Sequence, residues 1–254
     1  PWDSLFHQQN SAFWYASCHS IGAGGGSIFT PDFTPIPAYR QTMEEINEIK
    51  RGIGKLILSA DQVTDKIAVL YSQPSMHVAS LYPDPINQRT SWEAFIMGLE
   101  DNRYLYRFIS TEQLIKGVLK QYKVLVLPLT QALSSSEAQT ILDFAKNGGI
   151  VVADYNPGVR DEHGKILPVS LLAQLFDTSK GMSVKSLGEG KGIYLNSHTN
   201  LGPAIYSLLS AQGIKPALRL TETDGKTQVN ATSSAFKLED VTYVCVLASQ
   251  GMKK

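Results

Sequence analysis

The chain has few cysteines, no excess of charge and no long apolar run, and each absence excludes a class of protein. Its two cysteines, Cys18 and Cys245, lie far apart in 254 residues, so they predict neither a disulfide framework nor a thiolate zinc site. The 23 basic residues balance the 23 acidic ones, which gives no electrostatic reason to expect nucleic acid or an anionic membrane as a partner. No apolar run approaches the roughly 20 residues that a membrane-spanning helix needs. The cellular compartment stays undetermined.

What is present is an ordinary globular composition, 43% hydrophobic, organised around residues 66–75. Residues 67–71 form a continuous apolar run, which is typical of a strand covered by helices on both faces. Helices and strands are expected to alternate after it: helices at 90–102, 111–121 and 134–147, strands at 103–110, 123–129 and 149–155. This alternation predicts an α/β, doubly wound domain with a parallel sheet.

The segment before this domain has a different pattern. A short amphipathic helix at 2–9 is followed by an aromatic-rich apolar run at 12–16 and, from Pro37, by a helix of about twenty residues with one apolar face. A helix, a buried strand with aromatics and a closing helix are typical of the last turn of a (β/α)8 barrel. In that interpretation Trp14 or Tyr15 lies at the mouth of the barrel, and the alternative is that both are core residues.

The segment after the sheet domain has a helix at 201–212 and then three alternating stretches, 217–221, 227–232 and 241–248, with a hairpin signal at Asp224-Gly225. These stretches predict the first strands of an antiparallel β-domain. We therefore divide the chain into a barrel tail (1–62), a sheet domain (63–200) and a helix with the start of a β-domain (201–254).

Several motifs that suggest chemistry fail on closer inspection. The glycine cluster at 21–27 has neither the spacing nor the lysine of a phosphate-binding loop. Glu44 and Glu45 are adjacent on a helix, so they point in different directions. Three consecutive residues, 161–163 (Asp-Glu-His), rarely converge on one metal ion. The turn at 155–158, tested as the site of an amidotransferase nucleophile, has no Cys or Ser. We expect no catalytic residue, metal or cofactor.

The order of FWYAS, EINEIKRGIGKLI, KIAVLYSQPS and NGGIVVADYNPGVRDEHG resembles the C-terminal part of family 42 glycoside hydrolases, which are β-galactosidase-like enzymes. The resemblance implies the tail of a (β/α)8 barrel, then a trimerisation domain with a flavodoxin-like, class I glutamine-amidotransferase-like fold, then a β-domain. It also implies a retaining enzyme whose two catalytic glutamates precede this chain. Trp14 corresponds to a tryptophan that walls the sugar subsite. His19 corresponds to the histidine of a Glu-x-x-His motif whose glutamate is missing here, which argues against carrying over galactose specificity.

Two hypotheses of function follow. The first is that the chain is an excerpt of a longer glycoside hydrolase and serves as its non-catalytic assembly portion. In that case the partners are the carbohydrate substrate of the parent enzyme and further copies in a trimer, with Tyr82, Trp92 and Tyr104 as candidate interface residues. The alternative is a flavodoxin-like module that binds a small molecule or sugar in the loop 72–75. An active amidotransferase or peptidase is disfavoured because the nucleophile is missing.

Overall fold

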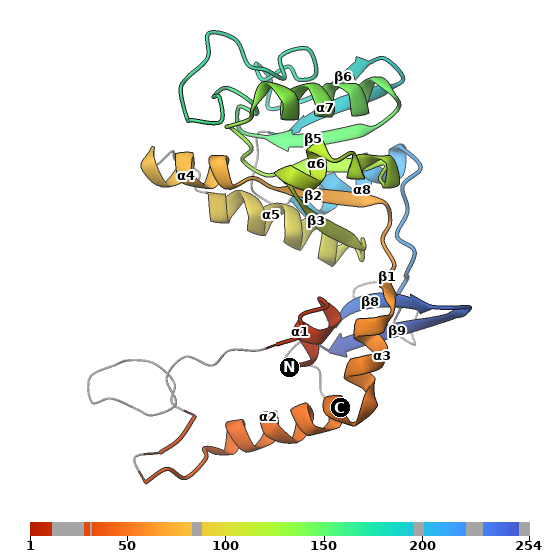
Figure 1. Cartoon of the computed structure of the whole chain (residues 1–254). Coiled ribbons are helices and arrows are strands. Elements are labelled where there is room, and N and C mark those ends of the chain that lie inside the picture. The colour runs from red at the N-terminus through yellow and green to blue at the C-terminus, as the bar shows by residue number, and fades with distance from the viewer. Residues whose placement is uncertain (12–27, 31, 83–87, 196–200, 222–230, 249–254) are drawn as a thin grey trace. The chain divides into compact units, whose positions relative to one another are not determined.

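The computed structural model describes residues 1–11, 28–30, 32–82, 88–195, 201–221 and 231–248, and it divides into two compact units. Unit 1 comprises Pro1–Val63 and Val229–Lys254, and unit 2 comprises Thr64–Gln228. Both units are drawn in Figure 1. None of the described helices is long and apolar enough to cross a membrane.

Unit 2 is built around a six-stranded sheet with strand order β3-β2-β4-β5-β7-β6, in which only the edge strand β6 runs antiparallel to its neighbour. The strands are β2 (Ile67–Tyr71), β3 (Tyr106–Ser110), β4 (Val124–Leu127), β5 (Ile150–Asp154), β6 (Met182–Leu187) and β7 (Gly190–Leu195). The helices are α4 (Gln73–Leu81), α5 (Gln88–Asp101), α6 (Thr111–Ile115), α7 (Ser135–Lys146) and α8 (Leu201–Ala211). The predicted mixed α/β fold with a parallel sheet is confirmed.

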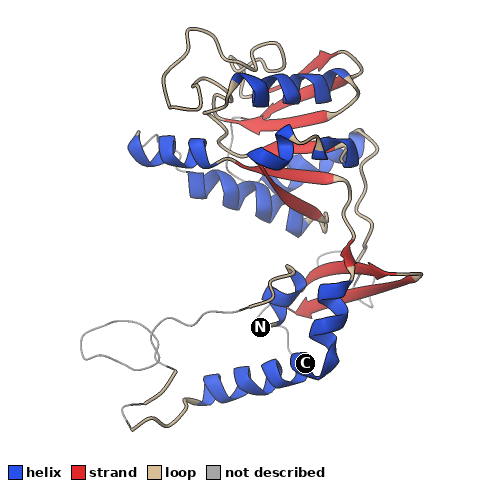
Figure 2. Cartoon of the chain, viewed as in Figure 1, coloured by secondary structure: helices blue, strands red, loops and turns tan. Residues whose placement is uncertain are grey.

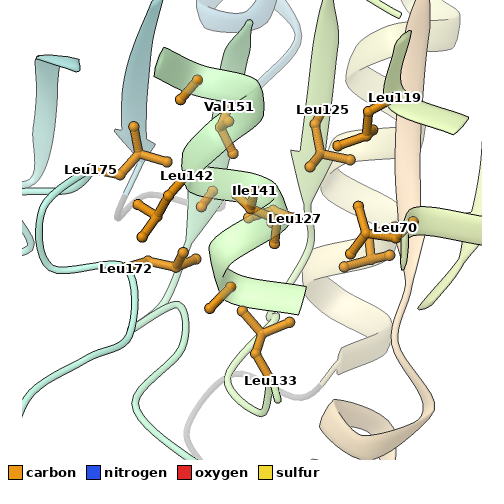
Figure 3. Packing of buried hydrophobic residues seen from close by; sticks show 14 of the residues in the cluster. Leu70, Leu119, Leu125, Leu127, Leu133, Ile141, Leu142, Val151, Leu172 and Leu175 are labelled. Atoms are coloured by element: carbon orange, nitrogen blue, oxygen red, sulfur yellow. The ribbon is translucent and has the colours of Figure 1, made fainter. Parts of the chain in front are cut away.

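Two hydrophobic clusters lie on the two faces of this sheet. On one face α6 and α7 cover the strands, and Figure 3 shows α7 with Ile141 and Leu142 lying across the side chains of β4 and β5. On the other face α5 and α8 cover residues such as Ile67 and Val69, which are fully buried. Burial on both faces explains the continuous apolar run of β2, because alternate side chains enter different clusters.

Helix ends follow local sequence signals in this unit. Ser134 caps α7 by accepting a hydrogen bond from the Glu137 N–H, while the Glu137 carboxylate accepts one from the Ser134 N–H at 2.7 Å. The helix predicted for 111–121 is interrupted, because Gly117 has φ +84° and only a 3-10 turn (Val118–Gln121) follows. Glycine adopts this left-handed conformation at little cost, so the helix ends there.

Unit 1 contains α1 (Trp2–Phe6), α2 (Pro37–Glu48), α3 (Gly54–Ser59) and a three-stranded antiparallel sheet of order β1-β8-β9, with the strands in red in Figure 2. Its strands are β1 (Asp61–Gln62), β8 (Ala231–Leu238) and β9 (Val241–Ala248). A small core of Leu5, Ile57, Ala60 and Phe236 joins α1 and α3 to the sheet. The chain segments on either side of unit 2 therefore fold together.

Three details of unit 1 differ from the sequence prediction. The long helix from Pro37 is bent at a π-helical turn (Ile49–Ile53), where Gly52 has a non-helical φ of 149°. The hairpin joins β8 to β9 through Glu239, at φ 52°, while the predicted hairpin at 224–225 lies outside the described residues. The stretch 217–221 forms no strand.

The sheet unit also extends beyond the boundary predicted at residue 200. Helix α8 packs on α5 and contributes Leu201, Ile205 and Leu209 to the core of unit 2. The apolar face of α8 is buried against a face of the sheet that would otherwise be uncovered. The end of unit 2 therefore lies at Gln228 rather than at residue 200.

Candidate assembly surface

The segment after β2, predicted as a ligand loop at 72–75, is the first turn of α4. Ser72 caps this helix, and its Oγ accepts a hydrogen bond from the Ser75 N–H at 3.3 Å. The Ser75 Oγ accepts a hydrogen bond from the Ala132 N–H at 3.0 Å and donates one to the Ala132 carbonyl at 3.1 Å. Both serines are buried, so their hydroxyls tie α4 to the segment after β4. This is a correction to the binding-module hypothesis, which needs these groups to face a ligand.

The turn after β5 holds a buried carboxylate. Asp154 is fully buried and accepts hydrogen bonds from the Leu129 N–H at 2.6 Å and from the Ser91 hydroxyl at 2.5 Å. The next two residues, Tyr155 and Asn156, have positive φ values of 36° and 46°. A strained turn at a strand end is where a nucleophile stands in related sheet enzymes, but the side chains here are a phenol and an amide. The Asp154 side chain thus ties the end of β5 to the turn after β4 and to α5.

The remaining sites considered in the sequence are the triplet at 161–163 and the sugar contacts. Searched over those residues, the chain has no group of three His, Cys, Asp or Glu side chains able to hold a metal. The Asp161 carboxylate accepts hydrogen bonds from the His163 and Lys165 N–H groups, which closes a tight turn. Trp14 and His19, the predicted sugar contacts, lie outside the described residues.

Tyr104, one of the three predicted interface residues, is a core residue and not a surface anchor. Its side chain is 2% exposed, and its hydroxyl donates a hydrogen bond to the Ile214 carbonyl at 2.9 Å. Burial raises the pKa of this phenol above its ordinary value. Tyr104 was predicted at an interface because it is aromatic, but its ring is covered by the segment that follows α8.

Trp92 instead belongs to a chain of four touching aromatic rings at one edge of the sheet. Its indole stacks on the Phe108 ring at 5.3 Å between centroids, and the Tyr71 ring meets it edge-on, also at 5.3 Å. Tyr106 continues the chain, edge-on to Phe108 at 5.6 Å, and donates its hydroxyl proton to Glu100 at 2.7 Å. We call these four residues the aromatic ridge.

The aromatic ridge is partly open to solvent. Phe108 is 41% exposed and Tyr71 is 37% exposed. Both belong to the face covered by α5, since Phe108 pairs with Val69 in register and Trp92 of α5 contacts both rings. The strand β3 that carries Phe108 is an edge strand, paired on one side with β2. Exposed, mutually packed aromatic rings beside a sheet edge are the composition of a protein contact surface.

Sequence reasoning found Trp92 and missed Tyr71, Tyr106 and Phe108. The signal was present in the residue types, because two consecutive predicted strands carried aromatic residues. Only the parallel pairing of β2 with β3 brings these rings under one crossover helix.

Tyr82, the third predicted interface residue, follows α4. It is 55% exposed, and the Arg160 guanidinium lies over its ring at 4.5 Å from the centroid. The preceding Leu81 is 72% exposed. This pair is a second apolar patch in unit 2, with a cation on one side.

The family model described as "Beta-galactosidase trimerisation domain" matches residues 108–184, from Phe108 in β3 to Val184 in β6. The matched stretch lies wholly within unit 2. No curated protein matches the chain. The match to this family model confirms the family resemblance seen in the sequence.

Solved structures with a similar fold extend the likeness beyond the trimerisation domain. A β-galactosidase from Bacillus circulans sp. alkalophilus superposes on 90% of this chain with a TM-score of 0.69 and 17% identity, over 42% of its own length. One from Rahnella sp. R3 covers 92% of this chain with a TM-score of 0.70 and 12% identity, over 43% of its length. A family 42 β-galactosidase from G. stearothermophilus covers 87%, with a TM-score of 0.67 and 12% identity, over 40% of its length. The chain thus spans less than half of these relatives.

Proposed function

We propose that this chain is the non-catalytic, C-terminal assembly portion of a family 42 glycoside hydrolase, and that the aromatic ridge is the surface through which copies of it associate. The observation that carries the proposal is the exposed, mutually packed ring chain inside a unit matched by a trimerisation-domain family. The parent enzyme would act on a carbohydrate substrate, with its catalytic glutamates outside this chain.

The strand order supports the finer fold assignment. The five parallel strands lie in the order β3-β2-β4-β5-β7 when the antiparallel edge strand β6 is left out. Numbered from one to five along the chain, this order is 2-1-3-4-5, which is the flavodoxin-like order. We assign unit 2 to the flavodoxin-like, amidotransferase-like folds on this basis.

The helix α2 supports the barrel-tail interpretation of unit 1. It carries apolar residues at helical spacing, including Tyr39, Met43 and Ile46, and yet none of its residues is buried. An apolar helix face of this length needs a partner surface, and the outer helix of a (β/α)8 barrel has one in the barrel itself. Trp14 and His19 then belong near the sugar-binding mouth.

A trimer with three-fold symmetry constrains how the aromatic ridge is used. In a ring of three copies each contact joins two different surfaces, so the ridge of one copy does not meet the ridge of the next. The Leu81–Tyr82 patch is a candidate for the receiving surface, since it is exposed, apolar and in the same unit.

The test is a charge on the aromatic ridge, with a matched control at the opposite edge of the sheet. Phe108→Glu places a carboxylate among the four rings, whereas Val184→Glu changes a residue that is 54% exposed on the other edge strand, β6. We expect Phe108→Glu to weaken self-association at least about tenfold and Val184→Glu to leave it unchanged, as measured by sedimentation. Equal association constants for the two variants would exclude the ridge as the contact.

A further inference from the structure

Unit 2 has a groove at the amino ends of β4 and β5. One wall is the 3-10 turn (Val118–Gln121) with the residues that follow it, and the other is the C-terminal half of α7. Its volume is about 370 Å³, and small-molecule sites have roughly 300–1,000 Å³. Doubly wound sheets usually bind ligands at the carboxyl ends of their strands, so this groove lies at the opposite end of the sheet. It shares no residue with the aromatic ridge.

Two lysine side chains that line the groove have no ion-pair partner among the residues that the structure describes. Lys120 and Lys123 are both exposed, and no carboxylate of the described residues lies within ion-pair distance of either. Other lysines of the same unit, Lys116, Lys146 and Lys180, pair with a carboxylate three or four residues away. The groove therefore presents two uncompensated ammonium groups to solvent.

The remaining charges around the groove leave it positive. Burial raises the pKa of the Tyr122 phenol in the groove wall, and the nearby Arg107 guanidinium opposes this rise, which places a third cation close by. Asp143 is the acidic lining residue, and its carboxylate already lies 3.7 Å from the Lys146 Nζ. Glu189 lies beside Gly148. Three cations against one unpaired carboxylate favour an anionic ligand.

The groove also offers hydrogen-bonding groups whose capacity the protein does not use. The Asn147 Nδ2 donates to the Asp143 carbonyl at 2.8 Å, and the Asn147 Oδ1 has no partner in the described part of the chain. The Thr140 hydroxyl donates to the Ser136 carbonyl at 2.8 Å, which leaves its oxygen as an acceptor. The Tyr122 hydroxyl forms no hydrogen bond with any residue that the structure describes. Acceptors of this kind bind the hydroxyl groups of a ligand.

Phe144 supplies an apolar surface in the same groove. Its ring is half-buried and lies against the backbone at Gly149, where an added Cβ would clash with the ring. The lack of a side chain at Gly149 thus allows the ring to line the groove. An apolar ring next to hydrogen-bond acceptors matches a ligand that has both an apolar face and hydroxyl groups, as a sugar ring does.

We propose that this groove binds a hydroxylated organic anion with the chemistry of a sugar acid or a sugar phosphate. Lys120 and Lys123 bind its anionic group through charge-assisted hydrogen bonds. The Asn147 Oδ1 and the Thr140 Oγ1 accept hydrogen bonds from its hydroxyls, and Phe144 contacts its apolar face. The site rests on the groove alone, so it holds or fails independently of assembly through the aromatic ridge.

Calorimetric titration of the whole chain with four probes tests the class of ligand. Glucuronate and glucose 6-phosphate carry both an anionic group and hydroxyls, whereas glucose lacks the anion and inorganic phosphate lacks the sugar ring. We expect at least one acidic sugar to bind about tenfold or more tightly than glucose and inorganic phosphate, because each of these two loses one set of contacts. Which acidic sugar binds assigns the anionic group as carboxylate or phosphate. Binding of neither acidic sugar, or equally tight binding of glucose or inorganic phosphate, would overturn the proposal.

The position of the site is tested by removing its charges. The double variant Lys120→Gln, Lys123→Gln has a matched control in Lys165→Gln, Lys215→Gln, which removes two exposed lysines elsewhere in unit 2. We expect the first to weaken binding of the acidic sugar about tenfold or more and the control to leave it unchanged. Asn147→Asp adds a carboxylate to the groove at almost unchanged shape and should weaken binding as well. Equal affinities of the two double variants would show that the anion binds elsewhere and would overturn the site.

Discussion

Asp154 shows at the residue scale how a buried polar side chain holds a strained turn in place. Its carboxylate accepts hydrogen bonds from Leu129, which has a positive φ of 40°, and from Ser91 in α5. An acidic residue at the end of a parallel strand suggests catalysis, yet these contacts come from the protein itself. The residue ties β5, the turn after β4 and α5 together.

We expect Asp154→Ala to lower the free energy of unfolding by about 1–3 kcal/mol, because the buried Leu129 N–H loses its acceptor. Urea titration followed by tryptophan fluorescence measures the change. Asp177→Ala is the control, since Asp177 is bonded within its own surface turn, to Ser179 and Lys180, and should change the free energy by less than about 0.5 kcal/mol. Indistinguishable midpoints for the two variants would contradict the assigned role.

Cys245 in β9 gives a pH-dependent prediction for unit 1. Burial raises the pKa of its thiol above the ordinary value, because the thiolate is poorly solvated there. In a Cys18→Ser variant, we expect alkylation at about pH 8 to be slower in the folded protein than in urea, with the difference shrinking as the pH rises through the raised pKa. The raised pKa also links protein stability to pH. The stability contributed by the neutral thiol is fully present below the pKa that the thiol has in the unfolded protein, and it is lost as the pH rises through the higher pKa of the folded protein. Equal folded and unfolded rates at every pH would contradict this burial.

At the scale of elements, the strands β2 to β5 of unit 2 were predictable, whereas β6, β7 and several connections were not. Continuous apolar runs located β2, β4 and β5, since a strand buried on both faces leaves no other pattern. Helix α4 was missed because Gln73 and Pro74 after a strand favour a turn. In the structure Ser72 caps the helix and Pro74 lies in its first turn, where proline is compatible with a helix. The aromatic ridge was missed because its members come from three elements that only the sheet pairing brings together.

The complete burial of two side chains in β2 gives the prediction at this scale. Ile67 and Val69 have no exposed surface, so truncating either to Ala should cost about 2–4 kcal/mol of unfolding free energy through lost burial and a residual cavity. Val184→Ala on the exposed edge strand β6 is the control and should cost below about 1 kcal/mol. A urea midpoint unchanged by Ile67→Ala or Val69→Ala would contradict the burial of these side chains in the core.

At the scale of the whole molecule, the sequence did not indicate which parts of the chain fold together. The sequence predicted a barrel tail, a sheet domain, and a helix with the start of a β-domain, in that order. It did not indicate that segments at both ends form one unit, because the pairing of β1 with β8 joins residues more than 170 positions apart, such as Asp61 and Lys237. It also placed α8 outside the sheet unit, since an amphipathic helix does not reveal which surface covers it.

The central claim is that this chain associates with copies of itself, and sedimentation equilibrium tests it directly. The measurement extends to about 100 μM, a concentration at which even weak association is detected. We expect the average mass of the wild-type protein to rise with concentration toward three times 27.9 kDa. Phe108→Glu should hold the mass near that of one chain at the same concentrations. A wild-type mass that stays at 27.9 kDa throughout would contradict the account.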